Sequence, residues 1–302
     1  MNFDTLLLLG SIILPIIGSL IFFLGYPKND ELLKKVGYLI FGFPFLAGVI
    51  LFLKFDSSDG YCFELLYDRM GLQKLGITFH LGLNGVSSPL FAMAGIVGFG
   101  AGLAAIHSGV DRLHLYLGLL AFMLSGLMGL FASVDLFFYY LFHEFALIPT
   151  FIMIGIWGGQ DRRCISLEIT IYLTLGALIS LGGLVAINVL VDAPKFDFPH
   201  LSAALAEVEI FDSTAKKIFG LLLFGFGILV ALFPFHTWAV RGYDAAPTSV
   251  SMLHAGVLKK FGLYGLIQIA VPLLPDAAFS WSPWLMCLAL GNVIFVGMVA
   301  VA

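Results

Sequence analysis

The feature that most constrains the fold is the stretch from Asp135 to Trp157, where a carboxylate lies inside a run of apolar and aromatic residues. The run is long enough for one helix across a hydrocarbon core about 30 Å thick. Glu144 lies near its middle. A charge at that depth costs at least about 2.5 kcal/mol, so such a residue is a candidate functional group that needs a partner.

The other apolar residues also form long runs. The chain has 302 residues, of which 60% are hydrophobic and 11% are charged, whereas about 25% of a soluble domain is charged. This composition predicts an all-α polytopic membrane protein, because helices satisfy their own backbone polar groups in lipid. We expect a single membrane domain over 1–302, with an N-terminal part of about 1–106 and a core of about 113–302. The runs predict about nine transmembrane helices, near 5–24, 36–53, 81–106, 113–131, 135–157, 165–189, 216–233, 248–270 and from 284 onward.

Two polar segments, 54–80 and 192–214, interrupt this pattern, and we expect short amphipathic pieces on the membrane surface in the second. The first apolar run lacks the basic start and small-residue end of a cleaved signal peptide, so it is expected to remain a membrane helix. Gly95, Gly98 and Gly102 suit close packing of the third helix. The ninth run is still apolar at Ala302, so we expect a C-terminally truncated fragment of a longer protein.

The seventh helix is expected to be broken at Pro234. The sequence that follows, PFHTWAVRGYDAAP, is too polar for a plain continuation. Inside a membrane, such a break is tolerated only within protein or beside water. The next helix is expected to begin after Pro247, with Thr248 or Ser249 as its N-cap.

Basic residues in the loops set the expected orientation. Cytoplasmic loops are enriched in lysine and arginine, and short loops carry most of that signal. Loops after the first, third, fifth and seventh helices are short, whereas the bases of the other loops lie in long segments with acids such as Asp59 and Asp68. We therefore expect the first set in the cytoplasm and the N-terminus outside. The first set is Lys28, Lys34, Lys35, Arg112, Arg162, Arg163 and Arg241, and the second is Lys54, Arg69, Lys74, Lys195, Lys216 and Lys217.

Two lysines share the depth of the acid. Lys260 lies about 12 residues into the eighth helix, or about 18 Å along its axis, and Lys259 points roughly 100° away. Adjacent ammonium groups disfavour each other's charge. We expect Lys260 to function in proton transfer, while Lys259 either shares that function or makes a structural contact near a water cavity.

Glu144 and three histidines complete the predicted proton relay. A carboxylate between apolar surroundings and a nearby lysine can gain or lose a proton as its neighbour moves. The alternatives are a static ion pair and a neutral acid that hydrogen-bonds Tyr139 or Tyr140. Histidine titrates near neutral pH, so His143, His236 and His254 are candidate proton carriers, although a lone histidine is more often a core residue.

The sequence gives no sign of a cofactor or metal site. Cys62, Cys164 and Cys287 are far apart and form no C-x-x-C pair, which argues against zinc or iron–sulfur ligation. The histidine spacing is not that of a zinc site. The sequence also lacks a P-loop, a dinucleotide fingerprint and a nucleophile elbow.

Three segments resemble the antiporter-like membrane subunits of complex I (NADH:quinone oxidoreductase) and Mrp antiporters. HEFALIPTFIMIGIWGG is similar to the W-E-x-x-L-x-P-x-x-x-x-I-x-x-W-G segment of the M type, with His143 in place of tryptophan. PFHTW with APTSVSMLHAGVLKKFGLYGL resembles that family's segment around its broken seventh and its eighth helix. LGLNGVS resembles L-G-x-D-G-[IL]-S, with Asn84 in place of aspartate. The specific motifs begin near residue 80.

The resemblance implies roles for individual residues. Glu144 falls on the family's fifth-helix glutamate, Lys260 on its eighth-helix lysine and His236 on the histidine after the break. The family pairs that glutamate with a seventh-helix lysine, and Leu229 stands at this position. We therefore hypothesise that Lys259 supplies the missing partner of Glu144. The family chain has about fourteen helices, of which this sequence holds the first part.

The resemblance further implies a proton-translocating, non-redox subunit of a respiratory NADH:quinone oxidoreductase. Quinone, FMN and iron–sulfur clusters are expected in partner subunits, namely L- and N-type antiporter-like subunits and small membrane subunits. The expected location is the bacterial inner membrane, in contact with lipid and not with nucleic acid. The alternatives are a subunit of an Mrp-type sodium/proton antiporter or membrane-bound hydrogenase, a stand-alone transporter that binds a small solute at the helix break, and a structural scaffold.

Overall fold

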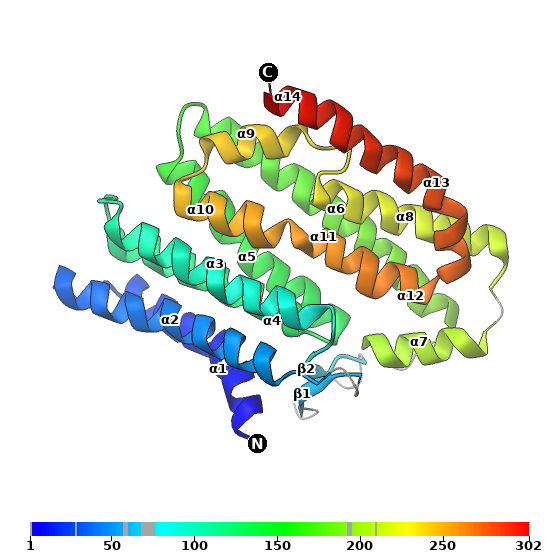
Figure 1. Cartoon of the computed structure of the whole chain (residues 1–302), viewed down its shortest axis with the longest axis horizontal. Coiled ribbons are helices and arrows are strands. Elements are labelled where there is room, and N and C mark those ends of the chain that lie inside the picture. The colour runs from blue at the N-terminus through cyan, green and yellow to red at the C-terminus, as the bar shows by residue number, and fades with distance from the viewer. Residues whose placement is uncertain are drawn as a thin grey trace. The chain divides into compact units, whose positions relative to one another are not determined.

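The computed structural model in Figure 1 describes residues 2–27, 29–56, 60–67, 76–191, 195–208 and 210–301. Five charged loop residues that bear on the expected orientation lie outside these ranges, namely Lys28, Asp59, Asp68, Arg69 and Lys74. Ala302 also lies outside them.

Long apolar helices dominate the described part of the chain. Nine of its helices are long and apolar enough to cross a membrane, which confirms the predicted all-α polytopic class. These are α1 (Phe3–Phe23), α2 (Asp30–Lys54), α3 (Ser87–His107), α4 (Leu113–Ala132), α5 (Leu136–Trp157), α6 (Arg162–Val191), α8 (Asp212–Val230) and the spans Thr248–Leu273 and Pro275–Val296.

The last two spans are continuous helices of mixed geometry. The first consists of α10 (Thr248–Leu253), the π-helix η2 (His254–Leu258), α11 (Lys260–Tyr264), the π-helix η3 (Gly265–Ala270) and α12 (Val271–Leu273). The second consists of α13 (Pro275–Gly291) and the π-helix η4 (Asn292–Val296), and α14 (Gly297–Val301) follows it. π-helical turns are rare and occur often at functional sites. The sequence did not predict them.

The short elements lie in the polar segments and after the helix break. β1 (Cys62–Tyr67) and β2 (Phe79–Leu83) form an antiparallel hairpin in which Leu65 pairs with Leu81. The apolar pattern did not predict this hairpin, and residues 81–83 were expected in the third helix, because a short apolar run fits a strand or a helix equally well. The amphipathic piece expected in the second polar segment is α7 (Phe198–Glu207), and α9 (Thr237–Ala245) follows the break after α8.

Three predicted helix starts and one predicted cap are wrong. α2 begins at Asp30 because the Asn29 side chain accepts a hydrogen bond from the Glu31 amide, so Lys34 and Lys35 lie inside the helix. α3 begins at Ser87, after an Asn84 side chain that accepts hydrogen bonds from the amides of Val86 and Ser87. α13 begins at Pro275 rather than Trp284, because a proline fits the first turn of a helix.

Pro247 precedes α10 and provides no side-chain cap, so neither Thr248 nor Ser249 is the N-cap of this helix.

The contacts divide the chain into two compact units. Unit 1 comprises Met1–Ser166 and Ala245–Leu258, and unit 2 comprises Leu167–Asp244 and Lys259–Ala302. In unit 1, α2 packs on α3, and α4 packs on α1 and α5. The predicted packing role of the α3 glycines is confirmed, because a Cβ at Gly95 would lie 2.6 Å from the Pro44 carbonyl oxygen. In unit 2, α8 packs on α11 and α13. The single membrane domain inferred from the sequence stays a prediction.

Candidate functional site

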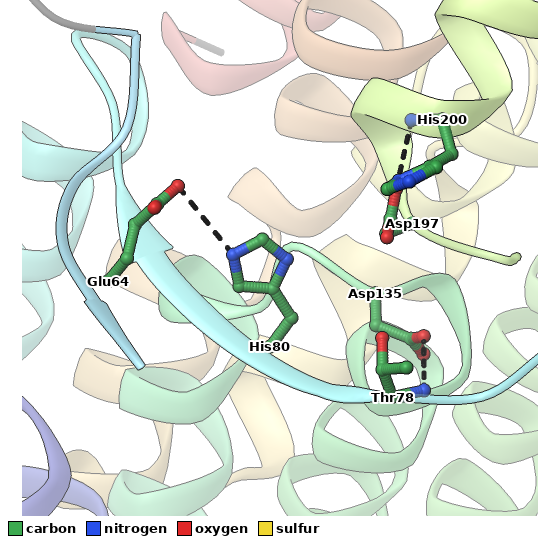
Figure 2. Close-up of polar contacts among 6 residues, drawn as sticks. All are labelled: Glu64, Thr78, His80, Asp135, Asp197 and His200. Atoms are coloured by element: carbon green, nitrogen blue, oxygen red, sulfur yellow. Dashed lines mark hydrogen bonds and ion pairs between the residues drawn. The ribbon is translucent and has the colours of Figure 1, made fainter. Parts of the chain in front are cut away.

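The first turn of α5 is held by a buried carboxylate. Asp135 precedes the helix, is fully buried, and accepts hydrogen bonds from the amides of Phe137 (2.8 Å) and Phe138 (3.3 Å). Its second oxygen accepts a hydrogen bond from the Thr78 amide at 3.1 Å, as Figure 2 shows. A carboxylate at this position also interacts favourably with the positive end of the helix dipole. Asp135 therefore joins the segment before β2 to the helix that carries Glu144.

The hairpin carries a second polar contact in the same unit. In Figure 2, the side chains of Glu64 on β1 and His80 on β2 point toward each other, with the Glu64 Oε1 3.6 Å from the His80 Nε2. The backbone carbonyl of His80 also accepts a hydrogen bond from the Val134 amide at 2.9 Å. The hairpin is thus fixed to the chain between α4 and α5. In unit 2, the Asp197 side chain caps α7 and contacts His200.

Glu144 lies on α5 beside a buried histidine. The Nδ1 atom of His143 is 3.5 Å from the Glu144 Oε1, and the His143 side chain is 1% exposed, whereas that of Glu144 is 42% exposed. α5 is held closely against α4, because a Cβ at Gly126 would lie 2.7 Å from the Phe142 carbonyl oxygen and 2.8 Å from the Ala146 amide. The acid is therefore placed by a rigid backbone contact on one side and is open on the other.

His254 belongs to the same unit as this acid. It is the first residue of η2, is completely buried, and lies in a helix that packs against α3 and α5. Small residues allow that packing, since a Cβ at Gly256 would lie 3.3 Å from the Val97 Cγ1. Three of the six predicted relay residues, His143, Glu144 and His254, are thus in unit 1.

The break after α8 carries His236 in unit 2. α8 ends at Val230, and its C-cap, Ala231, adopts a left-handed conformation with φ of 61°. The backbone carbonyls freed by the break find side-chain donors, because the Trp238 Nε1 donates to the Ile228 oxygen at 3.1 Å and the Asn292 Nδ2 to the Ala231 oxygen at 3.4 Å. The His236 ring stacks on Phe233 with ring centroids 5.6 Å apart, and its Nδ1 is buried without a hydrogen bond among the described residues. The predicted break is confirmed.

Lys259 and Lys260 lie at the start of α11, and both are partly buried. Lys259 precedes Gly262 by three residues, so the two residues share one helix face. That face packs on α8, because a Cβ at Gly262 would lie 2.5 Å from the Phe226 oxygen and 3.0 Å from the Leu229 Cβ. Lys259 is therefore on the side of α11 that faces the helix carrying Leu229.

The six predicted residues thus fall into two groups of three, one in each unit. The pairing of Glu144 with Lys259 stays a prediction. Two polar residues of this region were not assigned by the sequence analysis. Asp135 could have been recognised, because an aspartate just before an apolar run is an N-cap signal. Asn292 could not, because its role depends on which helix packs against the break.

Ionisable side chains within long apolar spans, together with a broken helix, define the class: a multi-pass membrane protein with buried groups of the kind that mark ion pathways. The chain belongs to the NADH:quinone oxidoreductase/Mrp antiporter transmembrane family, whose pattern it matches over residues 133–302.

Relatives of known name support this assignment. NADH-quinone oxidoreductase subunit M of Rickettsia felis is 27% identical over 97% of this chain and 59% of its own length. NAD(P)H-quinone oxidoreductase chain 4 3 of a Picosynechococcus species is 33% identical over 77% of this chain and 42% of its own length. The chain therefore spans 59% of the length of the first relative and 42% of the length of the second.

Solved structures share the fold. A chain of respiratory complex I from Thermus thermophilus with bound NADH matches with a TM-score of 0.80 and 27% identity, over 93% of this chain and 56% of that chain. A chain of an archaeal membrane-bound sulfane sulfur reductase matches with a TM-score of 0.71 and 22% identity, over 89% of this chain and 41% of that chain. The second likeness concerns the fold alone.

Proposed function

We propose that this chain is a proton-translocating membrane subunit of a respiratory NADH:quinone oxidoreductase. The observation that carries the proposal is the position of Glu144, inside an apolar span, next to the buried His143 and in the same compact unit as the buried His254. An imidazole can take up and release a proton through its two ring nitrogens, so the two histidines can exchange protons with a carboxylate. The likeness to subunit M of relatives and to a chain of complex I supports the reaction class.

In this proposal, proton transfer uses side chains of both units. Glu144 exchanges a proton with His143 or His254, and Lys260 and Lys259 change protonation state in response to the charge on Glu144. The His236 Nδ1, which is buried at the helix break, takes or gives a proton there. Redox energy released in other subunits reaches these groups as a conformational or electrostatic shift.

The assembly and the location are part of the same proposal. Electron transfer is assigned to partner subunits that hold FMN, iron–sulfur clusters and the quinone, because the sequence of this chain carries no motif for them. The proposed partners are L- and N-type antiporter-like subunits and small membrane subunits. The proposed location is the bacterial inner membrane with the N-terminus outside.

The experiment that tests this function is Glu144→Gln in the assembled complex, with protons translocated per quinone reduced as the readout. We expect the ratio to fall while quinone reduction continues in the presence of an uncoupler. Glu31→Gln is the matched control, because Glu31 is an exposed acid that pairs with Lys35 on α2. An unchanged ratio in Glu144→Gln would reject the proposal.

The family also includes Mrp antiporters, so a sodium/proton antiporter subunit is the second candidate function. It predicts sodium-dependent proton exchange in vesicles and no co-purification with quinone-reactive subunits. Co-purification with iron–sulfur and quinone-reactive subunits would favour the respiratory complex.

A further inference from the structure

We infer that the hydroxyl groups of Tyr116 and Ser249 form a proton-transfer pair at one end of unit 1. This inference rests on the proposed function and adds two residues to the path that leads to His254. Tyr116 lies in the first turn of α4, and Ser249 is the second residue of α10. Their oxygens are 2.5 Å apart, and both side chains are buried.

The chemistry of this contact differs from that of other buried hydroxyls in the same unit. Ser11, Ser125 and Ser133 each donate to a backbone carbonyl oxygen, which holds their hydrogen in place. Between Tyr116 and Ser249, either oxygen can be the donor. A hydroxyl is both donor and acceptor and can rotate, so two hydroxyls in contact can pass a proton in either direction.

The transfer step is balanced without a net charge on either residue. A proton binds a lone pair of the Tyr116 oxygen while the phenolic hydrogen moves to the Ser249 oxygen. The hydrogen of Ser249 leaves at the same time to a water molecule, which the proposal places on the side of the pair away from Tyr116. Each oxygen breaks one O–H bond and forms one, and rotation of both hydroxyls restores the starting arrangement.

The position of the pair suits the entrance of a path. The Tyr116 ring contacts Trp157 edge-on at 5.2 Å, and the Arg112 guanidinium lies 5.5 Å from the centre of the same indole. Arg112 precedes the first residue of α4. Ser249 precedes the fully buried His254 by five residues in the span Thr248–Leu273. The pair therefore has a guanidinium near the Tyr116 ring and shares the span of Ser249 with a buried imidazole.

The packing around the pair makes it testable with small changes. Tyr116→Phe keeps the ring that contacts Trp157 and removes only the hydroxyl group. Ser249→Ala removes the other hydroxyl, and Ser249→Thr restores one. Ser125→Ala is the matched control, because Ser125 is equally buried in α4 and bonds a backbone carbonyl.

The experiment measures the rate of proton translocation during quinone reduction, and its dependence on pH, in vesicles that contain the assembled complex. We expect Tyr116→Phe and Ser249→Ala to lower the proton-transfer rate by a factor on the order of 10, which is below the ~100-fold that a lost acid–base group typically causes. The loss should deepen as pH rises on the side that supplies protons. Ser249→Thr should recover most of the rate, and Ser125→Ala should change nothing.

Two outcomes would overturn the inference. One is an unchanged rate in both Tyr116→Phe and Ser249→Ala. The other is an equal loss in the Ser125→Ala control, which would show that any buried hydroxyl in α4 matters only for packing. Glu144→Gln is measured in the same vesicles. If it abolishes translocation while the hydroxyl variants are silent, only the hydroxyl inference fails, and if it is also silent, the proposed function fails.

Discussion

Gly262 of α11 lies so close to Leu229 of α8 that a methyl group added to the glycine would come 3.0 Å from the Leu229 Cβ. Leu229 is 2% exposed, and the resemblance to the family implies a lysine at this position. The leucine is buried against α11, the helix that begins at Lys260. Within unit 2, this contact fixes the face of α11 that packs on α8, and the pairing of Lys259 with Glu144 stays a prediction.

The first prediction concerns the compensation of Leu229 by Lys259. We expect Lys259→Met to lower proton translocation per quinone reduced, because the acid at Glu144 would lose its proposed basic partner. Adding Leu229→Lys to Lys259→Met should recover part of the loss, since it returns a base to the neighbouring helix. A Lys259→Met variant with normal translocation and a normal titration of Glu144 would refute the compensation. The measurement is proton uptake in vesicles of the assembled complex.

The second prediction concerns the close contact of α8 with α11. Gly262→Ala should destabilise the protein by about 1–3 kcal/mol, because the added methyl group meets backbone and Cβ atoms that cannot move aside. Gly182→Ala is the matched control, since nothing lies within 4 Å of its added methyl group. Thermal unfolding of the purified complex in detergent measures both. Equal melting temperatures for the two variants would show that α8 and α11 are not held this closely.

The third prediction concerns the buried cap of α5. Asp135→Ala should lower the free energy of unfolding by about 0.5–2 kcal/mol, the range for a lost N-cap. Asp135→Asn should cost less, because the amide oxygen still accepts a hydrogen bond. Asp212→Ala, which removes an exposed carboxylate paired with Lys216, should stay within about 0.5 kcal/mol. Chemical unfolding curves compare the three variants. Similar losses of unfolding free energy in Asp135→Ala and Asp212→Ala would contradict the capping role of Asp135.

The fourth prediction concerns the left-handed residue at the helix break. A non-glycine residue in this conformation costs about 1–2 kcal/mol, so Ala231→Gly should raise the stability by about 1 kcal/mol. Ala186→Gly in the interior of α6 should lower it by about the same amount, because glycine is a poor helix former. The difference in sign between the two changes, measured by thermal unfolding, is the test. A destabilising Ala231→Gly would mean that the break has another geometry.

Most of the fold could be predicted because apolar runs of this length determine membrane helices. The positions of Glu144 and Lys260 near the middle of their spans were predicted from the same apolar runs. The break at Pro234 followed from the polar residues after it. The hairpin did not follow, because its strands are short and FHLGL continues into an apolar helix. The π-helical turns did not follow either, since they depend on packing rather than on local propensity.

The candidate site was predictable in its residue types and not in its contacts. Glu144 was recognised because a charged side chain inside a membrane span costs free energy. The hydroxyl contact between Tyr116 and Ser249 was not, because nothing in the sequence shows that the first turns of α4 and α10 meet. Asn292 was missed for the same reason, since its contact with the Ala231 carbonyl exists only once the last helix packs on the break.

The contact of Gly126 with the backbone of α5 has a consequence for how energy can reach the acid. α4 and α5 touch along Phe142 to Ala146 without side chains between them, so the two helices cannot slide past each other without breaking a backbone contact. The backbone that carries Glu144 is therefore held against α4 on one side. For the proposed function, we expect any movement that accompanies proton transfer to lie on the open side of the Glu144 carboxylate, so inhibitors that block that movement should be sought there rather than between α4 and α5.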